Sequence, residues 1–259
     1  MQQTPATRQD RSSPNTFRTT ARVVGVIYLA GMLIGIPANL LILSILDGPD
    51  QLPKIAASSM LLAICVVFWL IAVVGDAAHG VLMFPVLKQH SERAAVAYLA
   101  ARIMDATFID MMALLILVQI PVAIEYLNAG TADTSYLQAL SAVLNHANLY
   151  AYEFGMIALG VAGLILCYAF YRSQLIPRLL AAWGLIGYAV LLSGSVLQVL
   201  GFNLNSIQAI PGGLWEVFIG VWLIVKGFSF SSHLPAEPTT SSMTPDLTPA
   251  LVGQRGTRA

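Results

Sequence analysis

The sequence predicts an all-α integral membrane protein, a bundle of six transmembrane helices with both termini in the cytoplasm. Three observations predict this fold: the scarcity of charged residues, six long apolar segments, and a one-sided distribution of lysine and arginine. Of the 259 residues, 57% are hydrophobic and 10% are charged, against about 25% charged in an ordinary soluble domain. So few charges could not cover a water-soluble fold of this size, and we therefore expect a lipid bilayer to surround most of the chain.

The six apolar segments are long enough to cross a bilayer as helices. A hydrocarbon core about 30 Å thick requires about 20 apolar residues that each rise about 1.5 Å. Helices are required because their backbone groups are satisfied within the segment. The expected spans are residues 23–46, 55–87, 94–123, 150–171, 176–200 and 211–230.

Local signals indicate how individual spans begin and end. Pro49 closes the first span, and Pro177 suits the first turn of the fifth. The second span is longer than the bilayer is thick, so it either projects from the cytoplasmic side or tilts. Leu137, Leu140 and Leu144 form one helical stripe ahead of the fourth span. This stripe predicts either an amphipathic helix on the outer surface or an extension of the fourth helix.

The orientation follows from lysine and arginine, which accumulate on the cytoplasmic side of membrane proteins. If the termini are cytoplasmic, Lys54 alone of the 13 basic residues lies outside. The twelve on the inner side are Arg8, Arg11, Arg18, Arg22, Lys88, Arg93, Arg102, Arg172, Arg178, Lys226, Arg255 and Arg258.

Polar tails flank the transmembrane domain, which we place at residues 21–230. Residues 231–259 carry four prolines and too little apolar surface to fold alone. We expect this tail and residues 1–20 to be disordered in the cytoplasm. The formal net charge is zero, so nothing electrostatic indicates a nucleic acid as a partner.

Three stretches carry a family resemblance. They are ARVVGVIYL at residues 21–29, YRSQLIPR with WGLIG within residues 171–187, and PGGLWE with WLIVKGF within residues 211–228. In this order and spacing they resemble an uncharacterised family of bacterial multi-pass membrane proteins, the domain-of-unknown-function family 4386. The resemblance implies fold and location but no activity. Such proteins often have an arginine followed three residues later by a glutamate in the third span; here Arg102 is followed by Asp105, a shorter carboxylate.

Ionisable residues inside the spans are the candidate functional residues, because a charge at a helix centre costs about 2.5–3.5 kcal/mol on insertion scales. The second and third spans form a hairpin that turns near His90, so residues whose numbers sum to about 180 should lie at one depth. This rule predicts a polar layer in the cytoplasmic half, made of Asp76, His79, Arg102 and Asp105. Within each helix the two residues are three apart on one face, so Arg102 can bind two carboxylates.

The polar layer has two interpretations. It can be a buried ion-pair network that fixes the register of the helices. Alternatively, it can be a site for a proton, a cation or a small polar substrate, with His79 titrating near neutral pH. In that case Arg102 anchors an anion or keeps Asp105 ionised, and Asp76 carries the proton.

A looser group of candidates lies toward the outer side. It consists of Asp110, Glu153 and Glu216, with His146 ahead of the fourth span. Such groups can bind a divalent cation, but no tight metal-ligand spacing occurs, so we predict no metal. Glu153 and Glu216 are expected at the wet outer interface. We predict neither catalytic residues nor a cofactor, since no phosphate loop, GxSxG elbow or dinucleotide glycine motif occurs.

Gly31 and Gly35 form a GxxxG pair on the first span. Small residues let helices approach closely in lipid, so the pair predicts either packing within the bundle or a homo-oligomer. The leading hypothesis for the whole chain is a bacterial inner-membrane protein with a structural or accessory role and no catalysis. The alternative is a small transporter, or a proton- or ion-coupled permease, that uses the polar layer. An intramembrane enzyme ranks third.

Overall fold

The computed structural model describes residues 14–229, except residues 49, 130–132 and 205. Within these residues the chain is helical and has no strand, and six helices are long and apolar enough to cross a membrane. These six are α1 (Pro14–Leu46), α3 (Ser59–Lys88), α4 (Glu92–Asn128), α5 (Ser135–Ser173), α6 (Arg178–Val199) and α7 (Ile210–Val225). The short α2 (Gln51–Ala57) joins α1 to α3, and a 3-10 turn, η1 (Ile207–Ala209), precedes α7. The predicted all-α membrane fold is confirmed.

The helix bounds differ from the predicted spans in three places. The second expected span begins as the separate helix α2, and a break at Ser58 divides it from α3. The stripe at residues 137–144 belongs to an extended fourth membrane helix, since α5 runs unbroken for 39 residues. Helix α1 begins at Pro14, inside the tail predicted for residues 1–20. The rest of that tail, and the tail at residues 231–259, lie outside the described residues.

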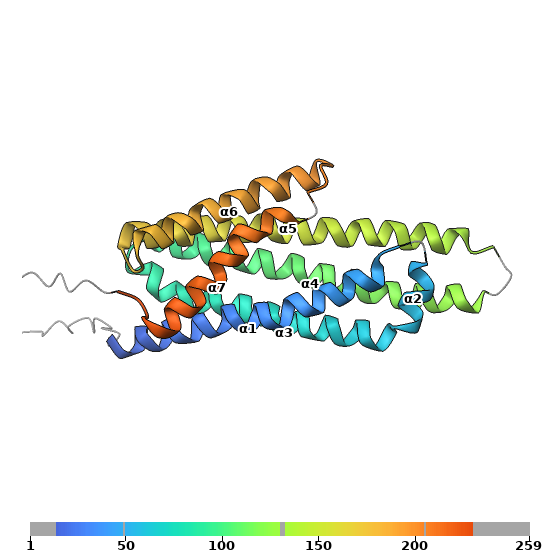
Figure 1. Cartoon of the computed structure of the whole chain (residues 1–259), viewed down its shortest axis with the longest axis horizontal. Coiled ribbons are helices and arrows are strands. Elements are labelled where there is room, and N and C mark those ends of the chain that lie inside the picture. Colours follow the sequence, from blue (N-terminus) through green and yellow to red (C-terminus); the bar gives the residue numbers. More distant parts are fainter. Residues whose placement is uncertain (1–13, 49, 130–132, 205, 230–259) are drawn as a thin grey trace, which may run out of the picture. The chain divides into compact units, whose positions relative to one another are not determined.

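The six long helices form a ring in which each packs mainly against two neighbours. The order around the ring is α1, α3, α4, α5, α6 and α7, and α7 packs against α1 to close it (Figure 1). Helices that follow one another in the chain are therefore adjacent in space, as short connections require. The contact between α1 and α7 is the one that joins the two ends of the sequence.

Both ends of the described chain lie at one end of this bundle, beside the α3–α4 and α5–α6 turns (Figure 1). The amide of Ser229, after α7, donates to the carbonyl of Leu175 in the α5–α6 turn at 2.8 Å. We call this the basic end, because it carries Arg18, Arg22, Lys88, Arg93, Arg172, Arg178 and Lys226. We call the opposite one the acidic end, because it carries Asp47, Asp50, Glu125 and Asp133 with Lys54.

Helices α1 and α7 cross closely near the basic end. A Cβ atom on Gly25 would lie 2.5 Å from the carbonyl oxygen of Gly220, so no larger side chain fits without a shift of backbone. Beyond the crossing, α7 runs away from α1 toward α6, and both α6 and α7 end well short of the acidic end (Figure 1). The half of the bundle nearer the acidic end is therefore built from α1 to α5, which leaves space beside α1.

Candidate functional site

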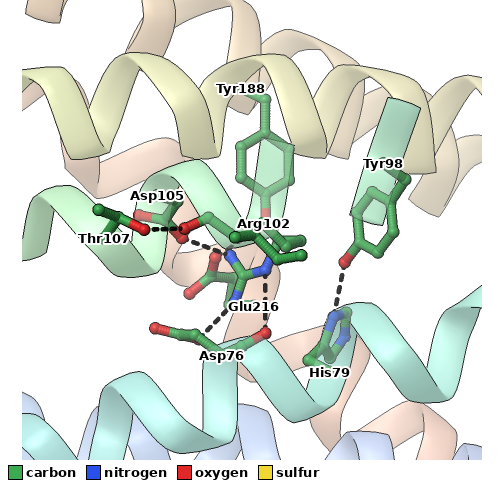
Figure 2. Close-up of polar contacts among 9 residues, drawn as sticks. Asp76, His79, Tyr98, Arg102, Asp105, Thr107, Tyr188 and Glu216 are labelled. Atoms are coloured by element: carbon green, nitrogen blue, oxygen red, sulfur yellow. Dashed lines mark hydrogen bonds and ion pairs between the residues drawn. The ribbon is translucent and has the colours of Figure 1, made fainter. Parts of the chain in front are cut away.

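Arg102 of α4 holds two aspartates from two helices (Figure 2). Its Nη1 donates to Oδ2 of Asp105 at 2.9 Å, and its Nη2 pairs with Oδ1 of Asp76 on α3. Its Nε faces the backbone carbonyl of Asp76 at 3.4 Å. The side chain of Arg102 is 5% exposed. Each guanidinium nitrogen thus has a protein partner, and two of the three contacts are the ion pairs that the hairpin register predicts.

Glu216 of α7 lies in the same layer. Its Oε1 accepts a hydrogen bond from the hydroxyl of Tyr188 on α6 at 2.8 Å, and it lines the same cavity as Asp76 and Arg102. The expectation that Glu216 lies at the wet outer interface is therefore wrong. The reason is that α7 begins at Ile210, partway along the length of the bundle, so its early residues do not reach the acidic end (Figure 1).

The layer lies near the middle of the membrane. Arg102, Tyr188 and Glu216 are each about ten residues along their helices from the basic residues at the basic end. At about 1.5 Å per residue this is about 15 Å, or half of a hydrocarbon core about 30 Å thick. Four different helices therefore bring polar groups to one depth, where each isolated charge would be expensive.

His79 shares this depth but has different partners. Its Nδ1 and the hydroxyl of Tyr98 are 2.6 Å apart (Figure 2). The ring of Tyr28 packs edge-on against His79, with ring centroids 4.6 Å apart. His79 is 1% exposed and is not one of the residues that line the cavity. The structure therefore groups Asp76, Arg102 and Asp105 with Glu216, and it sets His79 apart with Tyr98.

A cavity of about 260 Å³ adjoins the ion pairs, with walls from α1, α3, α4, α5 and α7. Asp76 opens onto it: its side chain is 41% exposed, against 5% for Arg102 and 2% for Asp105. The polar and aromatic groups of the lining are Asp76, Arg102, Glu216, Asn39, Tyr28, Trp69 and Tyr152. We call this space the central cavity.

Gly31 and Gly35 also line the central cavity. A Cβ atom added to either glycine would meet nothing within 4 Å. Within the chain, this pair therefore does not bring α1 against another helix, which was one of the two expectations. Its effect is to widen the central cavity.

Two further cavities continue from the central cavity along α1. One of about 340 Å³ shares Asn39, Leu40 and Tyr152 with the central cavity. The next, of about 480 Å³, shares Leu43, Asn148 and Leu149 with the second and reaches Asp47 and His146 at the acidic end. A four-residue spacing places Gly31, Gly35, Asn39, Leu43 and Asp47 on one face of α1. This face follows the cavities from the polar layer to the acidic end.

The remaining outer candidates do not converge. Glu153 is 1% exposed and accepts a hydrogen bond from Nε2 of Gln198 on α6, so its predicted place at a wet interface is wrong. Asp110 is exposed on the outside of α4, and His146 is near Ala142 of its own helix. Within the described ranges, no three histidine, cysteine, aspartate or glutamate residues are grouped to hold a metal ion.

Sequence reasoning missed the tyrosines that accompany the ionisable groups. Tyr98, Tyr188 and Tyr28 lie within apolar helices, and the first two are 1% exposed. A buried tyrosine hydroxyl usually has a hydrogen-bond partner. This rule could have flagged Tyr98 and Tyr188 as members of a polar layer, although it could not have named His79 and Glu216 as their partners.

Comparison with known proteins adds a family but no activity. A family model described as a domain of unknown function (DUF4386) matches residues 23–227. The matched range takes in nearly all of the six membrane-crossing helices. The searches of curated proteins and of solved structures gave no match.

Proposed function

The chain belongs to the DUF4386 family, and we propose that this member is a small permease-like protein that binds a solute in the central cavity. The observation that carries the proposal is that Asp76 and Glu216 open onto a cavity near the middle of the membrane. We place the protein in a bacterial cytoplasmic membrane with both termini inside, as the distribution of lysine and arginine predicts.

The exposure of Asp76 supports a ligand site over a purely structural network. A carboxylate inside a membrane protein is least expensive when protein atoms enclose it and its ion pair completely. Asp105 meets that condition at 2% exposure, whereas Asp76 leaves 41% of its side chain in the cavity. An open carboxylate at this depth requires water or a solute beside it.

The series of cavities supports access from one side. It leads from the central cavity to the acidic end, which we predict to be the outside. Toward the basic end the interior is packed: the ring centroids of Tyr28 and Trp215 are 6.3 Å apart, those of Tyr188 and Trp215 are 5.4 Å apart, and Trp215 is fully buried. A binding site near the midplane that opens to one side at a time is the arrangement used in alternating access.

A structural role for the polar layer is the second candidate. The observation in its favour is that Arg102 pairs with Asp105 on its own helix and with Asp76 on α3, so the ion pairs join α3 to α4 without any solute. On this hypothesis the protein is an accessory component of the membrane, and the central cavity has no ligand.

Thiol labelling separates the two candidates. We choose Ala72→Cys, because residue 72 lines the central cavity on α3 and the exchange keeps every charge. The matched control is Val74→Cys on the same helix, where the side chain is 69% exposed on the outside of the bundle. The native Cys65 and Cys167 are buried and give little background.

A charged, membrane-impermeant thiol reagent added to whole cells should label Ala72→Cys and not Val74→Cys. The physical reason is that water must reach the central cavity for the charged reagent to react, whereas lipid excludes the reagent from residue 74. Protection of Ala72→Cys from both faces of the membrane would argue against solute binding and favour the structural role.

A further inference from the structure

We propose that the solute is a small organic cation, namely an ammonium group that carries an apolar substituent. This inference rests on the proposed function, because it names the chemistry of the ligand that the central cavity takes.

The first argument is the balance of charge in the polar layer. Three carboxylates, those of Asp76, Asp105 and Glu216, accompany one guanidinium, that of Arg102 (Figure 2). Glu216 has a neutral hydrogen-bond donor in Tyr188. Unless a proton neutralises them, carboxylates outnumber the guanidinium in a medium where uncompensated charge is expensive. A cationic solute supplies what is missing.

The second argument is that an anion would meet Arg102 only beside the two aspartates that already bind it. The guanidinium nitrogens already face Oδ2 of Asp105, Oδ1 of Asp76 and the backbone carbonyl of Asp76. An anionic solute at Arg102 would lie beside the carboxylates of Asp76 and Asp105, whose negative charge repels it. A cation meets the exposed carboxylate of Asp76 without breaking an ion pair.

The third argument distinguishes an organic cation from a metal ion. Hard cations such as Ca²⁺ take six to eight oxygen ligands, and the described part of the chain holds no group of three suitable side chains. The lining instead offers the aromatic rings of Tyr28, Trp69 and Tyr152 among aliphatic side chains. Aromatic faces attract ammonium groups. The cavity volume of about 260 Å³ is slightly smaller than that of pockets for drug-sized ligands, so it suits a smaller solute.

Three probes of nearly equal shape test the ligand class. Choline is the cation, 3,3-dimethylbutan-1-ol is its neutral carbon analogue, and 3,3-dimethylbutanoate is the related anion. Each is titrated into the purified full-length protein in detergent, and heat is measured by calorimetry. We expect choline to bind at least about tenfold more tightly than the alcohol, since each 1.4 kcal/mol of ion attraction is a factor of ten. The anion should not bind.

Variants then assign the binding to the central cavity. Glu216→Gln and Asp76→Asn should each weaken choline binding at least about tenfold, because each removes a carboxylate that faces the solute. Gly35→Phe should abolish binding by filling the cavity. Asp110→Asn is the matched control and should leave binding unchanged, because Asp110 lies on the outside of α4. If Asp76→Asn fails to fold, Glu216→Gln carries the test.

The outcomes separate this inference from the proposed function. Equal binding of choline and the alcohol, tighter binding of the anion, or binding of none of the three would overturn the organic-cation ligand. Any of these results combined with labelling of Ala72→Cys leaves the proposed function in place. Absence of labelling at Ala72→Cys from both faces of the membrane, in whole cells and after permeabilisation, removes the proposed function itself.

Discussion

At the scale of single residues, Arg102 shows how a membrane interior accommodates charge. The guanidinium is 5% exposed and lies between the carboxylates of Asp76 and Asp105. Removing one partner of a buried ion pair destabilises a protein far more than replacing the whole pair with apolar residues. The reason is that the remaining partner keeps its charge without compensation. Here the loss of one side chain would leave two aspartates without their counter-ion.

We predict that Arg102→Leu lowers the free energy of unfolding by about 3–5 kcal/mol, the usual range for removing one partner of a buried pair. Unfolding of the purified protein in detergent, followed by circular dichroism, measures the change. The matched control is Lys88→Ala: Lys88 and Glu92 are 3.1 Å apart but 52% and 69% exposed, so the loss should be under about 1 kcal/mol. Equal stability of Arg102→Leu and the wild type would contradict the structural importance of the ion pairs.

At the scale of helices, glycines at two points on α1 have opposite effects on packing. Gly25 meets the backbone of Gly220 at the crossing with α7, whereas Gly31 faces the open central cavity less than two turns later. Both glycines occupy the same apolar helix, and the local sequence does not distinguish them. Only the course of α7 makes one position tight and the other empty.

We predict that Gly25→Leu destabilises the protein by at least about 1–3 kcal/mol, because overpacking forces the two helices apart. Gly31→Leu should fold normally, since no atom lies within 4 Å of its added Cβ, but it should lose choline binding. Melting temperatures in detergent and calorimetric titration measure the two effects. A lower melting temperature for Gly31→Leu would contradict this prediction. It would indicate that Gly31 packs against a neighbour, as in a homo-oligomer formed through Gly31 and Gly35.

At the scale of the whole molecule, charge is segregated between the two ends of the bundle. The basic end carries seven lysine and arginine residues of the described chain, and Lys54 is the one basic residue among four acidic ones at the acidic end. Because positive residues are retained in the cytoplasm during insertion, this asymmetry predicts that the acidic end, to which the cavities lead, lies outside.

We predict that Asp133→Cys, at the acidic end, reacts with an impermeant thiol reagent in intact cells. Gln89→Cys, in the α3–α4 turn at the basic end, should react only after the membrane is permeabilised. Both positions are exposed in the bundle, so access differs only through the side of the membrane. The reverse pattern of labelling would place the termini outside and would turn the proposed entry route toward the cytoplasm.

The candidate site was partly predictable from sequence. Asp76, Arg102 and Asp105 could be placed together because a hairpin of two helices fixes depth by residue number, and a three-residue spacing fixes the face. The same rule put His79 at the correct depth but could not show that Tyr98 and Tyr28 surround it. Glu216 was misplaced, because no local signal shows that α7 begins partway along the bundle, well short of the acidic end (Figure 1).

The amino-acid sequence by itself determined the six crossings, the grouping of basic residues at one end and the pairing of Arg102 with two aspartates. These features depend on the length of apolar segments and on the geometry of one helix or one hairpin, which neighbouring residues encode. The tertiary structure alone decided that Glu216 joins the layer, that Gly31 and Gly35 line a cavity, and that the cavities lead to the acidic end. These features depend on the tilt and crossing of α1 and α7, which are far apart in the chain and are set only when the ring of helices closes.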